Sequence, residues 1–288
     1  MNSVFFLIVT NIAMVVSISI ITSLLGVNQY ITAQGLNYQM LLAFCVVWGF
    51  AGSLIALVIS KPMAKRAMRV QLLDGTENAP AAWLVSTVRD LAEKSGIGMP
   101  DVGLYQGAPN AFATGMNKNK ALIAVSTGLL ETMNKAQVEA VLAHEVGHVA
   151  SGDMVTQTLV QGTVNAFTMF ISRILAFGIN AVVNKDRNSS GLYHVLVVVF
   201  DLLLGFLGAM VVAYVSRRRE FAADRFAAQL KGPVAMIGAL ESLGRKSAPL
   251  PEQMAAFGIS GGKSVWSLFA THPPIESRIA ALRQFKMG

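Results

Sequence analysis

One stretch of the sequence decides both the fold and the chemistry: residues 135–150 have the sequence KAQVEAVLAHEVGHVA. Asn134 is a good N-cap residue, and residues 151–153 (SGD) are typical of a helix end, so the stretch is predicted to form one helix. Inside it, residues 144–148 (HEVGH) match the pattern H-E-x-x-H. This spacing places both imidazoles on one helix face, one turn apart, where they can bind one metal ion.

Glu145 lies beside this histidine pair and not in line with it. Successive residues of a helix are turned by about 100°, so the Glu145 carboxylate is expected next to the metal and free to hydrogen-bond a water on it. Two histidines do not complete a zinc site, because a catalytic zinc takes a third protein ligand and keeps one position open. The sequence therefore predicts a third ligand elsewhere in the chain.

The composition indicates a membrane protein. Of the 288 residues, 53% are hydrophobic and 14% are charged, whereas about a quarter are charged in an ordinary soluble domain. No Lys, Arg, Asp or Glu precedes Lys61. So much apolar surface excludes a disordered chain, and the single cysteine, Cys45, excludes a disulfide framework.

Four apolar stretches are long enough to cross a bilayer as helices, two within residues 1–60 and two within residues 155–216. They cover residues 4–27, 36–60, 155–183 and 192–216. Arg173 interrupts the third stretch and Asp201 the fourth, and such residues at membrane depth usually face a bundle interior or a partner. A position of these two helices partly outside the lipid remains an alternative.

The distribution of basic residues predicts the orientation in the membrane. Nine Lys and Arg residues lie within 61–135 and eleven within 217–286, whereas the connections 28–35 and 184–191 hold two. The positive-inside rule therefore places both polar segments and both termini in the cytoplasm. The net charge of +7 follows from this topology, so no nucleic-acid partner is expected.

The polar segments 61–154 and 217–288 are expected to fold together, because they lie on the same side of the membrane. The first is predicted to contain a helix and three short strands forming a β-meander, before the helix with HEVGH. The second is predicted to be helical apart from a loop at 244–264. The predicted helices are 81–94, 217–230, 235–243 and one after Pro274, and the predicted strands are 101–106, 110–114 and 121–126.

Glu220 is the candidate for the third ligand. It lies in the sequence EFAAD (220–224), and Asp224 follows at i+4 on the same helix face. A second carboxylate of this kind commonly orients a ligating histidine. Gly147 and the small pair Ala222-Ala223 are expected to let the two helices approach closely.

These motifs together resemble the HtpX family of bacterial membrane zinc endopeptidases, which is related to the CAAX prenyl proteases. HEVGH lies between the second and third apolar stretches, EFAAD lies directly after the fourth, and THPP (271–274) lies near the C-terminus. The resemblance implies a mainly α membrane protein with four transmembrane helices and a zincin-like, cytosolic α+β catalytic domain built from two segments. It implies a gluzincin-like site with one Zn²⁺ per chain.

The resemblance also assigns roles to particular residues. His144, His148 and Glu220 would bind zinc, Glu145 would be the general base, and Asp224 would orient His144. His272 and Arg278, in a segment similar to the family's H-P segment, would stabilise the developing oxyanion. The substrate-binding edge strand beside the catalytic helix would hold four residues, Asn110, Ala111, Phe112 and Ala113.

The function implied by the resemblance is protein quality control and stress response, by cleavage of misfolded or damaged membrane proteins on the cytoplasmic side of the bacterial inner membrane. The implied partners are these substrates, the lipid bilayer and other membrane quality-control proteases. Two non-enzymatic alternatives remain: a metal sensor or transporter, and a metal-binding chaperone or scaffold. A transporter would have only Arg173 and Asp201 as ionisable residues along its path, and a pure binder has no use for Glu145.

Overall fold

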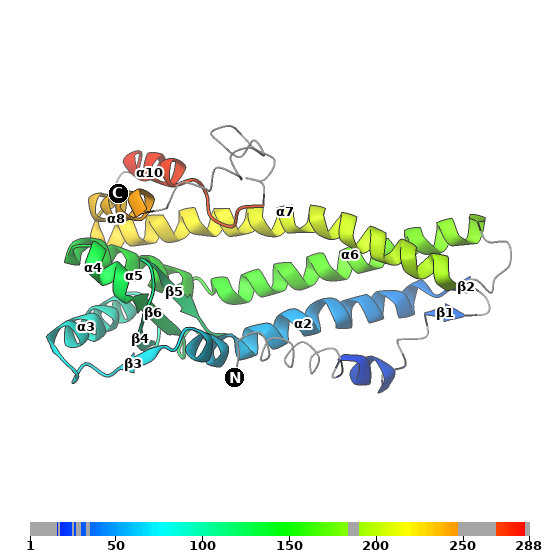
Figure 1. The fold of residues 1–288 in the computed structure, drawn as a ribbon, viewed down its shortest axis with the longest axis horizontal. Helices are drawn as coiled ribbons and strands as arrows, with labels where there is room; N and C mark the ends of the chain where they lie inside the picture. Colours follow the sequence, from blue (N-terminus) through cyan, green and yellow to red (C-terminus); the bar gives the residue numbers. More distant parts are fainter. Residues whose placement is uncertain are drawn as a thin grey trace. The chain divides into compact units, whose positions relative to one another are not determined.

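The structure is a computed structural model, and it describes residues 16, 18–24, 26, 30–32, 35–183, 190–246 and 269–285 (Figure 1). The chain divides into two compact units. The helical unit comprises residues 1–56 and 157–212, and the sheet unit comprises residues 57–156 and 213–288. The predicted first span (4–27) and the predicted loop 244–264 lie largely outside the described residues.

Within the described ranges, three helices are long and apolar enough to cross a membrane. They are α2 (Tyr38–Ala67), α6 (Asp153–Val183) and α7 (Ser190–Lys231), labelled in Figure 1. They contain the second, third and fourth predicted apolar stretches. A short antiparallel pair, β1 (Ile31–Thr32) and β2 (Gly35–Leu36), precedes α2. Four spans remain a prediction, because only residues 16, 18–24 and 26 of the first stretch are described.

The helices of the helical unit approach one another through small residues, as is common between membrane helices. A Cβ on Gly49 of α2 would lie 2.5 Å from the backbone nitrogen of Ala166 on α6. One turn away on α6, a Cβ on Gly162 would lie 2.7 Å from the ring of Phe50. Both glycines are therefore required by the close contact of α2 and α6.

The two charged residues in the predicted spans pair with each other. Arg173 of α6 lies 3.6 Å from Asp201 of α7, and its guanidinium also donates to the carbonyl of Met169. The expectation that ionisable residues at this depth face a partner is confirmed.

Residues 217–230 continue the fourth apolar stretch as one uninterrupted helix, because α7 extends to Lys231. The chain turns at Gly232, whose φ of 85° lies in the left-handed region that favours glycine. Pro233 then begins α8, in agreement with the break between the predicted helices 217–230 and 235–243. The polar part of α7 and the fourth apolar stretch therefore belong to the same helix.

Most predicted elements of the sheet unit are confirmed. The structure adds a short strand, β3 (Gln71–Leu73), and a short helix, α4 (Thr127–Thr132). The confirmed elements are α3 (Ala79–Lys94), β4 (Asp101–Tyr105), β5 (Ala111–Thr114), β6 (Leu122–Ser126), α5 (Lys135–Ala150), α8 (Pro233–Lys246) and α10 (Ile275–Arg283).

The predicted β-meander is wrong. A meander would place β5 between β4 and β6, but the strand order is β3-β4-β6-β5, with β4 and β6 parallel and β5 antiparallel to β6. The physical reason is burial. All five residues of β6 are buried, so this strand takes the central place, whereas the four residues of β5 are only half-buried. As a result, β5 forms an edge of the sheet that is open among the strands that the structure describes.

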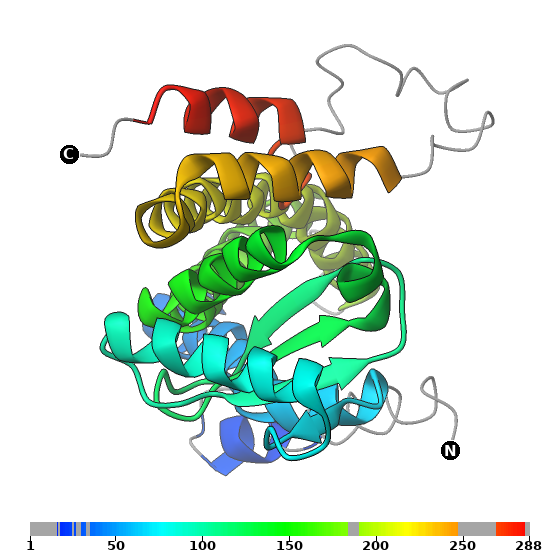
Figure 2. The same ribbon diagram turned by 90° about the vertical axis from the view of Figure 1, so that its left-hand side faces the viewer.

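The core of the sheet unit lies between the sheet and its helices. Ile123 and Val125 of β6 point into the same buried cluster as Leu142 and Val146 of α5. Figure 2 shows α5 beside the sheet, with α8 and α10 stacked beyond it. Asn134 caps α5 in a capping box with Gln137, as the sequence predicted for the cap. The helix that carries HEVGH is therefore fixed at its start and along its length.

Replacement of Leu142 by alanine is expected to lower the free energy of unfolding of the sheet unit by about 2–5 kcal/mol, because this side chain is fully buried. Leu72→Ala on β3 is the matched control, since Leu72 is 50% exposed and its loss should cost less than about 0.5 kcal/mol. Thermal unfolding of both full-length variants in detergent measures the difference. Equal thermal unfolding midpoints of the Leu142 and Leu72 variants would contradict this description of the core.

Candidate functional site

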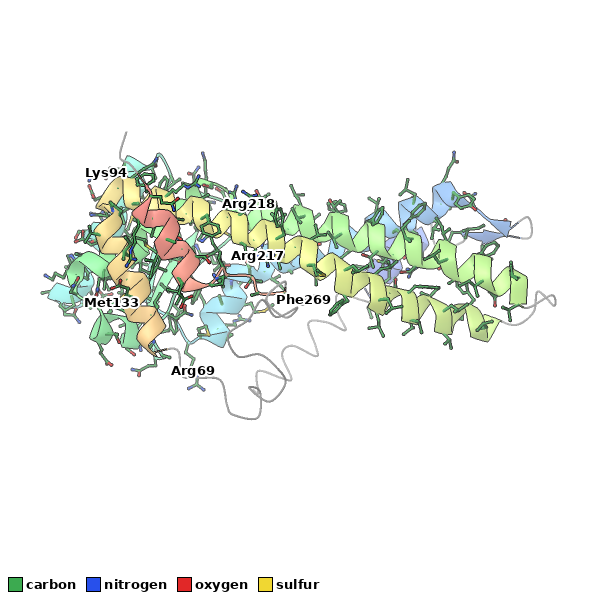
Figure 3. All side chains as sticks on the ribbon, turned by 90° about the horizontal axis from the view of Figure 1, so that it is seen from above. Arg69, Lys94, Met133, Arg217, Arg218 and Phe269 are labelled. Atoms are coloured by element: carbon green, nitrogen blue, oxygen red, sulfur yellow. The ribbon has the colours of Figure 1, made fainter. Side chains whose placement is uncertain are left out.

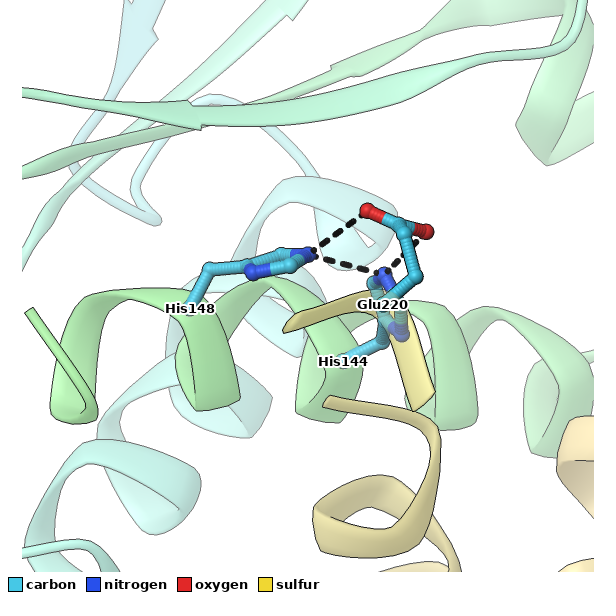
Figure 4. Close-up of side chains that lie close together, drawn as sticks. All are labelled: His144, His148 and Glu220. Atoms are coloured by element: carbon cyan, nitrogen blue, oxygen red, sulfur yellow. Dashed lines mark hydrogen bonds and ion pairs between the residues drawn. The ribbon is translucent and has the colours of Figure 1, made fainter. Parts of the chain in front are cut away.

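The two histidines of HEVGH point their Nε2 atoms at one place. These atoms lie 3.1 Å apart, and both residues are positioned by α5 (Figure 4). His144 is buried and His148 is half-buried. Their arrangement follows from the i, i+4 spacing that the sequence shows.

Glu220 of α7 brings the third group to the same place. Its Oε1 lies 3.3 Å from Nε2 of His148, and its Oε2 lies 3.7 Å from Nε2 of His144. The two helices come this close because position 147 carries no side chain: a Cβ there would lie 3.0 Å from the ring of Phe226. The expected role of Gly147 in this approach is confirmed.

The three groups fit a metal ion. Two ligands bound 2.0–2.2 Å from one tetrahedral ion lie about 3.4 Å from each other. The observed separations of 3.1, 3.3 and 3.7 Å are close to this value, and the ligand atoms all lie within 4.8 Å of one another. Two imidazoles and one carboxylate leave a fourth position open, which is the composition of a catalytic centre and not of a closed structural one.

Each histidine has a carboxylate at its other ring nitrogen. Nδ1 of His144 lies 3.0 Å from Oδ1 of Asp224, and Nδ1 of His148 lies 2.7 Å from Oδ2 of Asp153. An ionised carboxylate only accepts hydrogen bonds, so a carboxylate at Nδ1 favours a proton on that nitrogen. With a metal bound, Nε2 would then be the nitrogen that offers its lone pair to the ion.

Arg278 of α10 is buried behind the site. Its Nε and Nη2 donate to the two oxygens of Asp224 at 2.7 and 2.6 Å, and its Nη1 lies 3.1 Å from Oε2 of Glu220. All three guanidinium nitrogens are thus engaged by carboxylates of the site. His272, in contrast, has a side chain that is 68% exposed, and its Nδ1 lies 2.9 Å from Oε2 of Glu220.

The charges of the site keep its carboxylates ionised. Burial by itself would raise the pKa of Glu220, but hydrogen bonds from His148 and His272 and the nearby charge of Arg278 lower this pKa far below its usual range. Burial would likewise raise the pKa of Asp224, and the hydrogen bonds from Arg278 lower it overall. Both groups are therefore anions, ready to serve as metal ligand and hydrogen-bond acceptor.

Glu145 is the buried acid of α5 that makes none of these contacts. It is 9% exposed. Among the residues that the structure describes, none hydrogen-bonds to or forms an ion pair with its carboxylate. A buried carboxylate without such a partner, beside a set of metal ligands, is free to exchange a proton with a water molecule there.

The open edge of β5 lies on the same side of the sheet unit as α5, which it contacts. The amide of Ser126 donates to the carbonyl of Asn110, so Asn110 and Phe112 direct their backbone groups toward β6. Ala111 and Ala113 alternate with them and direct their N–H and C=O groups toward the open edge. Of the four residues predicted to bind substrate, Asn110 and Phe112 therefore attach β5 to β6. The backbone groups of Ala111 and Ala113 point away from β6, where they can pair with a substrate strand.

Neither Asp153 nor Arg219 belongs to a motif that the sequence assigns to the site. Asp153 is part of the predicted helix end at 151–153, and Arg219 is one of the eleven basic residues within 217–286. The structure places Asp153 against His148 and also pairs it with Arg219. Asp153 lies beyond the helix of His148, so no helical spacing connects the two residues.

Comparison with known proteins gives the family. The model of peptidase family M48 matches residues 78–286. "Protease HtpX homolog" of Paracidovorax citrulli is 51% identical over 289 residues, covering 98% of this chain and 99% of the relative. The protein of the same name from Thiobacillus denitrificans is 52% identical over 288 residues, with 98% and 99% covered.

A solved structure shares the fold. The crystal structure of S. mikatae Ste24p superimposes with a TM-score of 0.61 at 20% identity, covering 84% of this chain and 58% of that one. This chain thus spans less than two thirds of that structure. At this identity the likeness concerns the fold alone, a helical architecture that includes a sheet-containing domain.

Replacement of Glu220 by alanine is expected to abolish stable metal binding, because it removes one of three ligands and leaves two imidazoles with no charged partner for the cation. Glu131→Ala on α4 is the control, since Glu131 is exposed and remote in sequence from the motifs. Zinc titration of the detergent-solubilised, metal-stripped protein measures the zinc affinity of both variants. Retention of one tightly bound zinc by the Glu220 variant would rule out Glu220 as a ligand.

Proposed function

The chain belongs to peptidase family M48, and we propose that it is a zinc-dependent, zincin-like membrane endopeptidase that cleaves misfolded or damaged membrane proteins. One observation carries this proposal: three ligand atoms from two distant segments lie within 4.8 Å of one another, and the buried Glu145, whose carboxylate pairs with no residue that the structure describes, directly follows the ligand His144 in the chain. Zinc suits two imidazoles and a carboxylate.

When bound by His144, His148 and Glu220, zinc would supply Lewis acidity, which polarises a carbonyl group and makes water a stronger acid. Glu145 takes the proton of the attacking water and passes it to the nitrogen of the leaving amine. Asp224 keeps His144 in the tautomer that the metal requires. The peptide bond is thereby hydrolysed, with Glu145 ending in its initial ionised state.

His272 and Arg278 stabilise the negative charge that develops on the scissile carbonyl oxygen. His272 is suited to direct contact, because its side chain is exposed next to Glu220. Arg278 acts from behind Glu220 through its charge, since its nitrogens are already engaged by Asp224 and Glu220. His272 therefore stabilises the oxygen by direct contact, whereas Arg278 stabilises it by its charge at longer range.

The substrate binds as an additional strand along the open edge of β5. The backbone groups of Ala111 and Ala113 pair with those of the substrate, so recognition depends on an extended backbone more than on particular side chains. Folded proteins rarely offer such a segment, whereas misfolded ones do. This mode of binding supports a role in quality control and stress response.

The proposed location of the site is the cytoplasmic side of the bacterial inner membrane. The basic residues support this orientation, because they are concentrated in the two polar segments that form the site. The relatives reported above are bacterial proteins. The lipid bilayer, damaged membrane proteins and other membrane quality-control proteases are the proposed partners.

Neither non-enzymatic alternative gains support from the described residues. Arg173 and Asp201, the only ionisable candidates for a transport path, pair with each other. A metal-binding chaperone or scaffold would not need the carboxylate of Glu145 next to the ligands. We therefore retain the endopeptidase proposal alone.

Glu145→Gln is expected to keep zinc binding and to lower kcat/KM by about 100-fold or more, because the amide cannot accept the proton of water. Glu93→Gln, an exposed glutamate of α3, is the matched control and should cleave as the unmodified chain does. Cleavage of unfolded casein by purified, zinc-loaded protein in detergent provides the rate. Full activity of the Glu145 variant would refute its role as the base.

Ala113→Pro is expected to raise KM for an extended peptide about threefold to tenfold, because proline removes one N–H from the open edge of β5. Ala113→Ser keeps that N–H and serves as the control at the same position. Zinc affinity should be unchanged in both variants, since neither touches a ligand. An unaltered KM for Ala113→Pro would exclude strand pairing along β5.

A further inference from the structure

We propose that Asp153 and Arg219 form a second positioning pair for the metal site, acting through His148 in the way that Asp224 and Arg278 act through His144. The inference rests on the proposed metal-dependent function, and it assigns roles to two residues that no motif identified. Neither residue contacts the metal position or the substrate strand, so both are positioning residues.

The contact between Asp153 and His148 is the first observation. Oδ2 of Asp153 lies 2.7 Å from Nδ1 of His148, which is shorter than the 3.0 Å between Asp224 and His144. Asp153 is 6% exposed, so water does not compete freely for its oxygens. The carboxylate therefore fixes both the tautomer and the ring orientation of His148.

The pairing of Asp153 with Arg219 is the second observation. The guanidinium of Arg219 forms an ion pair with the other oxygen of Asp153, and its Nη2 also donates to the carbonyl of Ser151 at 3.2 Å. Ser151 is the C-cap residue of α5. Arg219 thus connects α7 both to the end of the HEVGH helix and to the first residue of α6.

The position of Arg219 in the chain gives the pair its importance. Arg219 directly precedes the ligand Glu220 on α7. One turn of this helix therefore supplies a metal ligand and also fixes the carboxylate that orients another ligand. If Arg219 holds Asp153 in place, Glu220 and His148 are brought to the metal position together.

The neighbouring arginines do not share this contact. The guanidinium of Arg217 donates to the carbonyl of Ala270 at 2.7 Å, and that of Arg218 donates to the hydroxyl of Tyr214. Figure 3 labels Arg217 and Arg218 on α7. Because Arg218 is exposed and contacts no residue of the site, it provides a matched control on the same helix turn.

The first test measures zinc affinity of the full-length, metal-stripped chain in detergent, by competition with a fluorescent chelator. Asp153→Ala is expected to weaken zinc binding by about 10- to 100-fold, the usual effect of removing such a partner. Arg219→Ala should weaken it less, by about threefold to tenfold, and Arg219→Lys should restore most of that loss because it keeps the charge. Arg218→Ala should bind zinc as the unmodified chain does.

The second test reads the histidine tautomer directly. The chain has four histidines, so selective ¹⁵N-histidine labelling gives few signals in an NMR spectrum. The zinc-loaded chain should show His148 protonated at Nδ1, assigned by loss of its signal in His148→Gln. In Asp153→Ala this Nδ1–H signal should weaken or shift, whereas Asp90→Asn, at a half-exposed acid of α3 that pairs with Lys94, should leave it unchanged.

The outcomes separate this inference from the proposed function. Zinc affinity of Asp153→Ala within twofold of the unmodified chain, with an unchanged Nδ1–H signal, would overturn the positioning role. An Arg219→Lys variant as weak as Arg219→Ala would overturn the charge-based role of Arg219. If the unmodified chain itself bound no zinc and cut no casein, the proposed function would fail, and the inference would fall with it.

Discussion

The meeting of the Glu220 carboxylate with the two imidazoles of α5 is the constraint on which the rest of the structure depends. It brings one anion and two potential cations into a buried space, where unpaired charges are costly. Asp224 adds a second anion and Arg278 a cation that bridges both acids. This balance of charge stabilises the packing of α5, α7 and α10 around the site.

Much of the site follows from local patterns in the sequence. The i, i+4 spacing of His144 and His148 determines their common face, and the caps around α5 determine where that helix begins. The same spacing relates Glu220 to Asp224. The long apolar stretches, separated by basic segments, indicate the membrane helices α2, α6 and α7. The length and apolar composition of a stretch are enough to predict such a helix.

Other features depend on contacts that no local pattern contains. The strand order of the sheet is determined by which strand is buried on both faces, and β6 takes the centre although β5 precedes it in the chain. Asp153 reaches His148 only because α6 starts with a turn away from α5. Nothing in the local sequence distinguishes Arg219 from Arg217 and Arg218. The three side chains leave α7 in different directions, and each therefore has a different partner.

The uninterrupted course of α7 through Glu220 and Asp224 fixes the angle between these two side chains. One residue inserted between them would rotate Asp224 by about 100° relative to Glu220 and shift it by about 1.5 Å along the axis. A loop would absorb such a change, but a continuous helix transmits it. The number of residues between the two acids is therefore as strictly constrained as their identity.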